Sequence, residues 1–256
     1  MIPRFAHRRP GSLAEAFAAW DAAGGDCAWY AGGTELLQVM KMGFARFGTL
    51  IDLKRIPELG GIAETAGGGL RIGAAVTHRE VERSPLVARR LPGLVRLEHE
   101  VANVRVRSTG TLGGNLAFAE PHSDPATFLL ACDARIALAG PSGTRTLAIG
   151  DFADGPLTTV READELLVAI EIPAGAPGEG RAYAKAAFFE RPAASASQPA
   201  TMRSRSSGVS GGASSRVHGS SSESPKWSSM WPMPPSPPAR WKVRPTPICA
   251  QRAPGP

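Results

Sequence analysis

The sequence predicts an α+β fold with at least two layers, and three observations support this expectation. Helix-like and strand-like stretches alternate from the N-terminus to about residue 191. Capping residues precede several helix-like stretches, and short apolar runs rich in β-branched residues lie between turn residues. Hydrophobic residues make up 43% of the 256 residues, which is enough to bury the core of one large domain or two small ones.

The helix expectations rest on capping chemistry. Ser12 and Glu15 form a capping box, in which the serine oxygen accepts a backbone N–H and the glutamate reaches back, and an alanine-rich helix is expected from there to Gly24-Gly25. Thr77 and Glu80 form a second capping box. Further helices are expected over 35–42 after a Thr34 cap, over 86–90 after Ser84-Pro85, over 92–101, and over 124–132.

Strands are expected where apolar, β-branched runs are bounded by turn residues. The run 166–172 is of this kind and ends at Pro173. A hairpin is predicted for 135–139 and 145–149, because Gly140 to Gly143 between them is typical of a turn. Shorter strands are expected at 50–53 and at 70–76.

The charge of the chain is unevenly distributed. Residues 192–256 carry eight Lys and Arg residues against the single acid Glu223, so this tail has a net charge of +7 and the other 191 residues a net charge of −1. The high sequence pI of the whole chain, 9.7, is therefore caused by the basic tail. A near-neutral body argues against a nucleic-acid-binding domain.

Composition also excludes several other classes of protein. Three widely spaced cysteines, Cys27, Cys132 and Cys249, do not make a disulfide framework and cannot alone hold an iron–sulfur cluster, so no metal site is expected. No apolar run reaches the roughly 18 residues that a membrane span needs. The basic N-terminus lacks the apolar region of a secretory signal, so a cytoplasmic location is expected.

The tail, 192–256, differs in character from the rest of the chain. It holds 15 serines and 12 prolines without a helix or strand period, which indicates a disordered tail. Trp227, Trp231 and Trp241 are unusual in such a segment. Trp and Met are each encoded by a single codon. The amino-acid sequence of the tail therefore partly fixes what the same gene would encode if its reading frame were shifted back by one base, and that frame permits helix-like sequences. The alternative hypothesis is therefore out-of-frame translation of a folded C-terminal segment, which a −1 frame rich in stop codons would contradict.

The first candidate site is the glycine cluster Ala31-Gly32-Gly33-Thr34-Glu35-Leu36. Two glycines let backbone N–H groups approach a ligand without hindrance from Cβ, and the helix expected after them adds the positive end of its dipole. This suits a phosphate or pyrophosphate, although the spacing is neither GxGxxG nor a P-loop. Taken alone, a simple turn capped by Thr34 also explains the cluster.

The second candidate site is the cluster Ser108-Thr109-Gly110-Thr111-Leu112-Gly113-Gly114-Asn115-Leu116. It is expected to offer exposed backbone donors together with a hydroxyl and an amide. Asp124 follows nine residues after Asn115, and it either caps a helix or accepts a hydrogen bond from a ribose hydroxyl.

The two clusters, in this order and at this spacing, resemble the FAD-binding subunit of the molybdenum hydroxylase family. That family includes the medium subunit of carbon monoxide dehydrogenase and the flavin domain of xanthine dehydrogenase. The resemblance runs from about Phe5 to Pro192, and it also draws on the segments 50–53, 70–74, 123–125 and 164–173.

The resemblance implies a two-lobed α+β FAD-binding domain of the PCMH type over 1–175. The start of an incomplete α/β C-terminal domain over 176–191 and the tail over 192–256 would follow. FAD would bind non-covalently and no side chain would be catalytic, because the isoalloxazine carries the redox chemistry. The implied FAD-binding residues are Ala31, Gly32, Gly33, Thr34, Glu35 and Leu36 at the pyrophosphate, Thr111, Leu112, Gly113, Gly114 and Asn115 in a second loop, Asp124 at the nucleotide, Leu167 in the flavin pocket, and Lys185 near the flavin.

The resemblance also implies partners. In the family the flavin takes electrons from a small subunit with a 2Fe–2S cluster, which a large molybdopterin subunit supplies, and it passes them to an acceptor such as NAD, oxygen or a quinone. This chain would then be an electron-transferring oxidoreductase subunit with no nucleic-acid partner. The sequence specifies neither the organic substrate nor the acceptor.

Other functions remain open at this level. The chain could be a truncated or frameshifted product with little activity, and Lys185 a solvated strand lysine. It could also be a free-standing FAD oxidase, although such an enzyme needs a substrate cavity and a catalytic acid or base, and no residue stands out for that role. A basic-tailed nucleic-acid-binding module is disfavoured by the near-neutral body.

Overall fold

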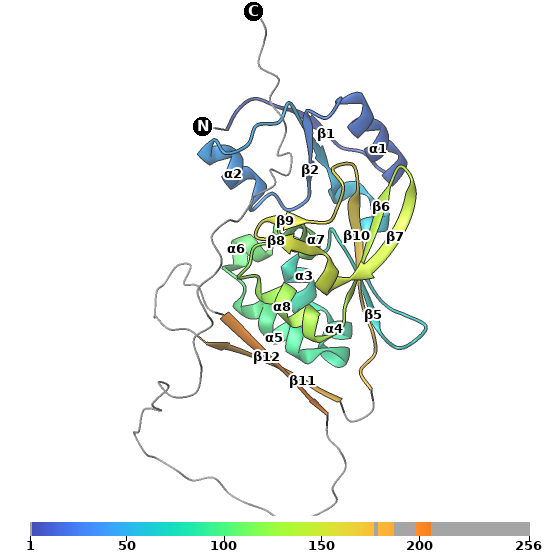
Figure 1. The fold of residues 1–256 in the computed structure, drawn as a ribbon, viewed down its shortest axis with the longest axis vertical. Coiled ribbons are helices and arrows are strands. Elements are labelled where there is room, and N and C mark those ends of the chain that lie inside the picture. Colours follow the sequence, from blue (N-terminus) through green and yellow to red (C-terminus); the bar gives the residue numbers. More distant parts are fainter. Residues whose placement is uncertain (1, 177–178, 187–197, 206–256) are drawn as a thin grey trace, which may run out of the picture. The chain divides into compact units, whose positions relative to one another are not determined.

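A computed structural model of the chain describes residues 2–176, 179–186 and 198–205 (Figure 1). The chain divides into two compact units, and all described residues lie in the first, Met1–Gly208. This unit contains a three-stranded and a five-stranded sheet with helices beside them, which confirms the expected mixture of helices and sheets. None of its described helices is long and apolar enough to cross a membrane.

The first sheet is parallel. Its strands, in spatial order, are β1 (Ala6–Arg8), β3 (Thr49–Asp52) and β2 (Cys27–Tyr30). Parallel neighbours need crossover connections, and α1 (Leu13–Ala22) and α2 (Leu36–Met42) lie in those connections. Two 3₁₀ turns, Leu53–Arg55 and Pro57–Leu59, then lead to the second sheet.

The second sheet is antiparallel. Its strands, in spatial order, are β4 (Ile62–Glu64), β5 (Leu70–Gly73), β10 (Leu166–Ile172), β6 (Arg135–Gly140) and β7 (Gly143–Ala148). Figure 1 shows the helices that follow β5 gathered beside this sheet. They are α3 (His78–Arg83), α4 (Pro85–Arg90), α5 (Pro92–Glu100), α6 (Val104–Arg107), α7 (Leu112–Phe118) and α8 (Asp124–Ala131). A 3₁₀ turn, Ile149–Asp151, and a small β8 (Ala153–Gly155) and β9 (Thr158–Thr159) pair connect β7 to β10.

Strand β10 separates two hydrophobic cores. Leu166 and Val168 pack with α1, β2 and β3, whereas Leu167 and Ile170 pack with the α3–α8 helices. A bulge between Leu167 and Ala169 shifts the register against β6. Because both faces are buried, β10 is a continuous apolar run rather than an alternating one, as its sequence predicted.

Most of the sequence-based caps are confirmed. The side chains of Thr77 and Ser84 accept N–H groups at the starts of α3 and α4, and Thr77 forms the full capping box with Glu80. Ser12 accepts from the N–H of Glu15, but the Glu15 carboxylate binds the N–H of Gly11, so this capping box is only half formed.

Three local expectations were wrong or incomplete. Thr34 does not cap α2: the N-cap is Glu35, without a side-chain hydrogen bond. Asp124 is the first residue of α8, and Ser123 is its cap. The helix α7 was missed because of its two glycines, yet Thr111 caps it and its buried leucines hold it against the core.

The C-terminal part of the described chain forms a hairpin. Strand β11 (Glu179–Ala186) pairs antiparallel with β12 (Gln198–Arg205). A tail without regular structure was expected from residue 192, so β12 departs from that expectation, and it provides β11 with hydrogen bonds along one edge. The Tyr183 ring packs edge-on against Phe128 of α8. The remaining tail, 206–256, lies outside the described residues, and the frameshift hypothesis stays a prediction.

Candidate functional site

The structure brings the two glycine clusters into contact. A Cβ added at Gly32 would lie 2.6 Å from both the Cα of Gly110 and the carbonyl oxygen of Thr109. One added at Gly114 would lie 3.9 Å from the Cβ of Ala31. The clusters are far apart in the sequence, yet their backbones touch where only glycine leaves room. The structure therefore brings the two clusters to one place.

The register of the parallel sheet explains where the first turn lies. Tyr30 ends β2 and pairs with Asp52, which ends β3. The turn Ala31–Thr34 thus leaves the carboxyl edge of the sheet, which is where ligands of open parallel sheets bind. Gly33 has φ +72°, and a Cβ there would collide with the Tyr30 ring at 2.2 Å.

The first turn presents unused donors. Among the described residues, none accepts a hydrogen bond from the backbone N–H groups of Gly32, Gly33 or Thr34. Gly32 is buried and the other two are partly buried, so these donors need a partner to offset lost hydration. Successive N–H groups in such a turn form a concave anion site. These residues therefore fit a pyrophosphate group.

In the second turn, unlike the first, the backbone N–H groups donate hydrogen bonds within the protein. The N–H of Leu112 donates to the Val76 carbonyl at 2.9 Å, that of Gly113 to Ala74 at 3.1 Å, and that of Gly114 to the Thr111 hydroxyl at 3.0 Å. The expectation of exposed backbone donors is wrong for these three groups, because the fold uses them. Leu112 is fully buried, so this turn is packed into the hydrophobic core.

Asn115 connects the second turn to the start of α8. Its Oδ1 accepts from the Ser123 hydroxyl at 2.5 Å, and Ser123 in turn accepts from the N–H of Ala126. Asp124, the next residue after Ser123, is 7% exposed. Tyr183 of β11 is near Asp124 as well. Burial raises the pKa of the Tyr183 hydroxyl, and the carboxylates of Asp124 and Glu100 raise it further.

The other two candidate site residues, Leu167 and Lys185, are expected near the flavin rather than at the glycine turns. Leu167 is 5% exposed and belongs to the core beside the helices. Lys185 lies on β11, and its side chain is outside the described residues. The described structure thus brings the two glycine clusters together and links Asn115 to Ser123, next to Asp124, while the FAD-binding role of each of these residues remains an expectation.

Sequence reasoning missed Lys54. Its Nζ donates to the Ala31 carbonyl at 3.1 Å, forms an ion pair with Asp52 at 2.9 Å, and lies 3.9 Å from the centre of the Tyr30 ring. The signal was present in the sequence as two polar residues at the end of a short apolar strand. These two residues can be connected with the first turn only when β2 and β3 are known to be parallel neighbours, because that pairing places Asp52 beside Tyr30.

Acidic groups also lie near the first turn. Burial, and to a smaller degree the Glu120 carboxylate, raise the pKa of Glu35. Glu120 is paired with His122 at 2.8 Å. The Glu35 and Glu120 carboxylates are thus within electrostatic reach of each other, and Glu35 directly follows the first turn in the chain.

A network of polar residues on α3, α5 and α6 is hydrogen-bonded to the start of the second turn through the backbone of His78. The N–H of His78 donates to the Gly110 carbonyl at 3.1 Å, and the His78 ring meets the fully buried Glu98 at 2.7 Å. Glu82 collects Arg79, Arg107 and His99 within 3.0 Å. These groups connect α3, α5 and α6 just before the chain enters the turn.

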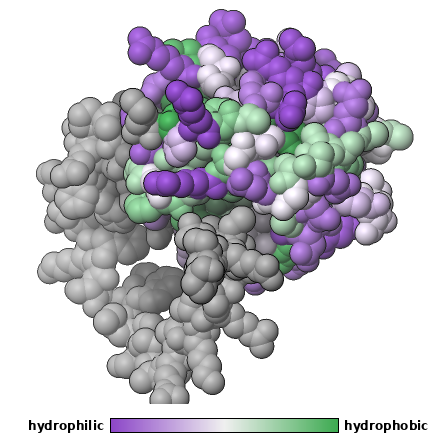
Figure 2. Space-filling model, turned by 90° about the horizontal axis from the view of Figure 1, so that it is seen from above, coloured by the Kyte–Doolittle hydropathy of each residue, from purple (hydrophilic) through white to green (hydrophobic). Residues whose placement is uncertain are grey.

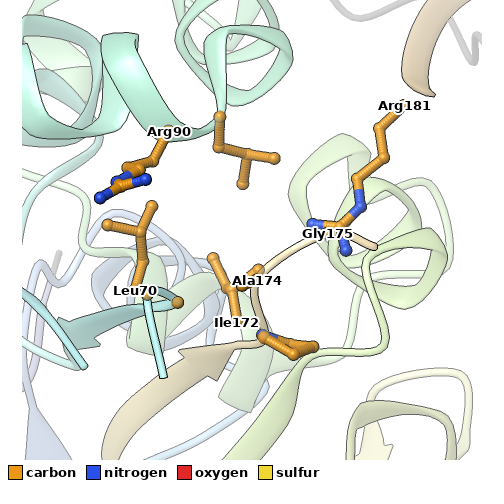
Figure 3. A pocket seen from close by; sticks show the side chains of 10 residues that line it. Leu70, Arg90, Ile172, Ala174, Gly175 and Arg181 are labelled. Atoms are coloured by element: carbon orange, nitrogen blue, oxygen red, sulfur yellow. The ribbon is translucent and has the colours of Figure 1, made fainter. Parts of the chain in front are cut away.

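A separate cavity of about 140 Å³ lies away from the turns. Figure 3 shows Arg90 and Arg181 on opposite sides of it, above Leu70 and Ile172. None of the glycine-turn residues lines it, so it does not belong to the candidate site. Among the described side chains, no group of three or more potential metal ligands comes together.

Comparison with known proteins gives a consistent result. Residues 3–175 match the family described as the FAD binding domain in molybdopterin dehydrogenase. The chain is 40% identical over 183 residues to the carbon monoxide dehydrogenase medium chain of Hydrogenophaga pseudoflava, covering 72% of this chain and 63% of that one. It is 34% identical over 143 residues to a xanthine dehydrogenase FAD-binding subunit of Escherichia coli O157:H7, covering 56% of this chain and 49% of that one.

The fold comparison agrees. The structure superimposes with a TM-score of 0.70 and 39% identity on the carbon monoxide dehydrogenase of Hydrogenophaga pseudoflava in a form that lacks the Mo-pyranopterin moiety. The match covers 74% of this chain and 66% of that chain. The matched part thus spans less than two thirds of the length of each of these relatives.

Proposed function

Because the chain belongs to the family of FAD-binding domains of molybdopterin dehydrogenases, we propose that it is the electron-transferring flavin subunit of a molybdenum hydroxylase-type complex. It is an oxidoreductase subunit with FAD as its cofactor. The observation that carries the proposal is the contact between the two glycine turns, beside a row of unused N–H donors.

Bound FAD supplies the redox chemistry through its isoalloxazine ring. The chain's own residues bind and orient it. The N–H groups of Gly32, Gly33 and Thr34 would bind the pyrophosphate, and the Thr111–Asn115 turn would bound the site on its other side. Asp124 would accept a hydrogen bond from the nucleotide moiety, and Leu167 and Lys185 would lie near the flavin. No general acid or base is required of this chain.

The partners in this proposal are a small subunit with a 2Fe–2S cluster and a large molybdopterin subunit. Support comes from relatives that are named as a medium chain and as an FAD-binding subunit. The names of these relatives refer to carbon monoxide and to xanthine, two chemically very different substrates. In this proposal, substrate specificity is therefore determined by a part of the complex other than the glycine turns. Figure 2 shows apolar residues gathered across the middle of one face, with hydrophilic residues above and below them. The electrons would pass to an external acceptor such as NAD, oxygen or a quinone.

The test is direct binding of FAD to the purified full chain. We expect saturable quenching of FAD fluorescence with one site per chain and a yellow protein after removal of excess ligand. FMN, which lacks the pyrophosphate-linked adenosine, is the control and should bind much more weakly. A chain that is folded by circular dichroism yet quenches neither ligand would favour the alternative, a truncated product without useful activity.

Replacing Glu35 by Gln is expected to tighten FAD binding about two- to fivefold at neutral pH, because it removes a negative charge beside the pyrophosphate. In the unmodified chain the carboxylate loses its proton as pH rises through its raised pKa, so FAD affinity should fall over that range. Titrations in mildly acidic and neutral buffer measure both effects. Equal affinities for the two chains at neutral pH would show that Glu35 does not face the ligand.

A further inference from the structure

We propose that Lys54 is a positioning residue for the pyrophosphate turn, fixing the peptide group between Ala31 and Gly32 so that its N–H faces the ligand. The inference rests on the proposed binding of FAD at this turn. It concerns a residue outside both glycine clusters, reached through the neighbouring strand.

The first step is the geometry of one peptide group. The Lys54 ammonium donates to the Ala31 carbonyl oxygen at 3.1 Å. A trans peptide is planar, and its C=O and N–H point in opposite directions. Holding the Ala31 oxygen toward Lys54 therefore holds the Gly32 N–H toward the opposite side. That N–H is the first of the three donors that have no acceptor among the described residues.

The second step is that Lys54 is itself held in place. Its Nζ pairs with Asp52 Oδ1 at 2.9 Å and sits over the Tyr30 ring at 3.9 Å, an arrangement typical of a cation–π contact. Asp52 is only 4% exposed, so its carboxylate is a rigid anchor. The backbone N–H of Lys54 also donates to Asp52, at 3.1 Å.

The third step is the charge at this corner of the sheet. His7 contacts Asp52 at 3.1 Å and Arg9 approaches it at 3.8 Å. With Lys54 and Arg9 charged against a single carboxylate, the corner keeps a positive charge beside the turn. Lys54 remains 42% exposed, so its charge still acts on an anion bound nearby. The Lys54 side chain thus orients the Gly32 N–H and also attracts the negatively charged group that this N–H would bind.

The experiment compares three variants of the full chain. Lys54→Met keeps the length and apolar stem but removes the charge and the donor, Lys54→Arg keeps both, and Lys41→Met removes an exposed lysine of α2 as the matched control. The measurements are the FAD dissociation constant by fluorescence quenching, the ³¹P resonances of bound FAD, and the melting temperature of the FAD-free chain.

We expect Lys54→Met to weaken FAD binding by about tenfold or more, as the loss of a charge-assisted hydrogen bond predicts. The ³¹P resonances should shift, and the melting temperature should fall as well, because the nearly buried Asp52 carboxylate loses its nearest cation. Lys54→Arg should restore most of the affinity, and Lys41→Met should change nothing. A structural effect alone would lower the melting temperature without moving the phosphorus resonances.

Two outcomes separate this inference from the function on which it rests. If the unmodified chain fails to bind FAD, the proposed function is wrong. If it binds FAD and Lys54→Met binds equally well with unchanged ³¹P resonances, only the role of Lys54 is overturned. A loss of affinity in Lys54→Met that Lys54→Arg shares in full also overturns it.

Discussion

Replacing Gly32 by Ala is expected to abolish measurable FAD binding and to lower the free energy of unfolding by about 2 kcal/mol. The added Cβ would lie 2.6 Å from the Gly110 Cα and the Thr109 carbonyl oxygen, and 2.9 Å from the Thr111 nitrogen. All three are backbone atoms, which cannot rotate away as a flexible side chain can. The two turns must therefore separate, and the N–H donors of the first turn lose their position against the second.

Gly67→Ala provides the matched control. A Cβ at Gly67 meets nothing within 4 Å, and this glycine does not have a positive φ. Its stability should change by no more than about 0.5 kcal/mol, and its FAD affinity should stay the same. Urea unfolding and FAD titration of both variants make the comparison. A Gly32→Ala chain that still binds FAD with the original affinity would show that the contact between the turns does not matter to the ligand.

Local signals explain which elements could be predicted. The β6–β7 hairpin, the capped helices α3 and α4, and strand β10 each carry their signal within a few consecutive residues. Strands β1 and β2 carry none: Ala6–Arg8 is exposed along its whole length, and its strand character comes from pairing with β3 across 43 residues of chain. Parallel pairing between distant segments leaves little trace in a single sequence.

The candidate site shows the same division. The two glycine clusters could be found because glycine pairs are visible in the sequence, and their contact follows from the resemblance. The use of the Leu112 and Gly113 N–H groups by Val76 and Ala74 could not be foreseen, because it depends on how the chain leaves β5. The role of Lys54 depends on the pairing of Tyr30 with Asp52 and was invisible for the same reason.

Replacing Glu82 by Gln is expected to lower the free energy of unfolding by about 3 kcal/mol at neutral pH. The Glu82 carboxylate binds Arg107 Nε at 3.0 Å, Arg79 at 3.0 Å and His99 at 2.9 Å. The Arg107 side chain is 9% exposed, so the variant leaves a nearly buried cation without its anion. Because Arg107 leads directly into the Gly110 turn, we also expect weaker FAD binding. Glu58→Gln, on an exposed residue, is the control and should change stability by no more than about 0.5 kcal/mol.

The pH dependence of this loss distinguishes a charge effect from a packing effect. Burial tends to raise the pKa of Glu82, but hydrogen bonds from His99, Arg79 and Arg107 outweigh it and hold the pKa at about 2. The folded-state pKa is thus below the unfolded value of about 4.3, so the stabilisation is complete above that value and is lost as pH falls toward 2. Urea unfolding of the two chains across this range should show a stability difference that is constant near neutral pH and shrinks in acid. A difference that stays the same down to the lowest pH would mean that Glu82 acts through shape rather than charge.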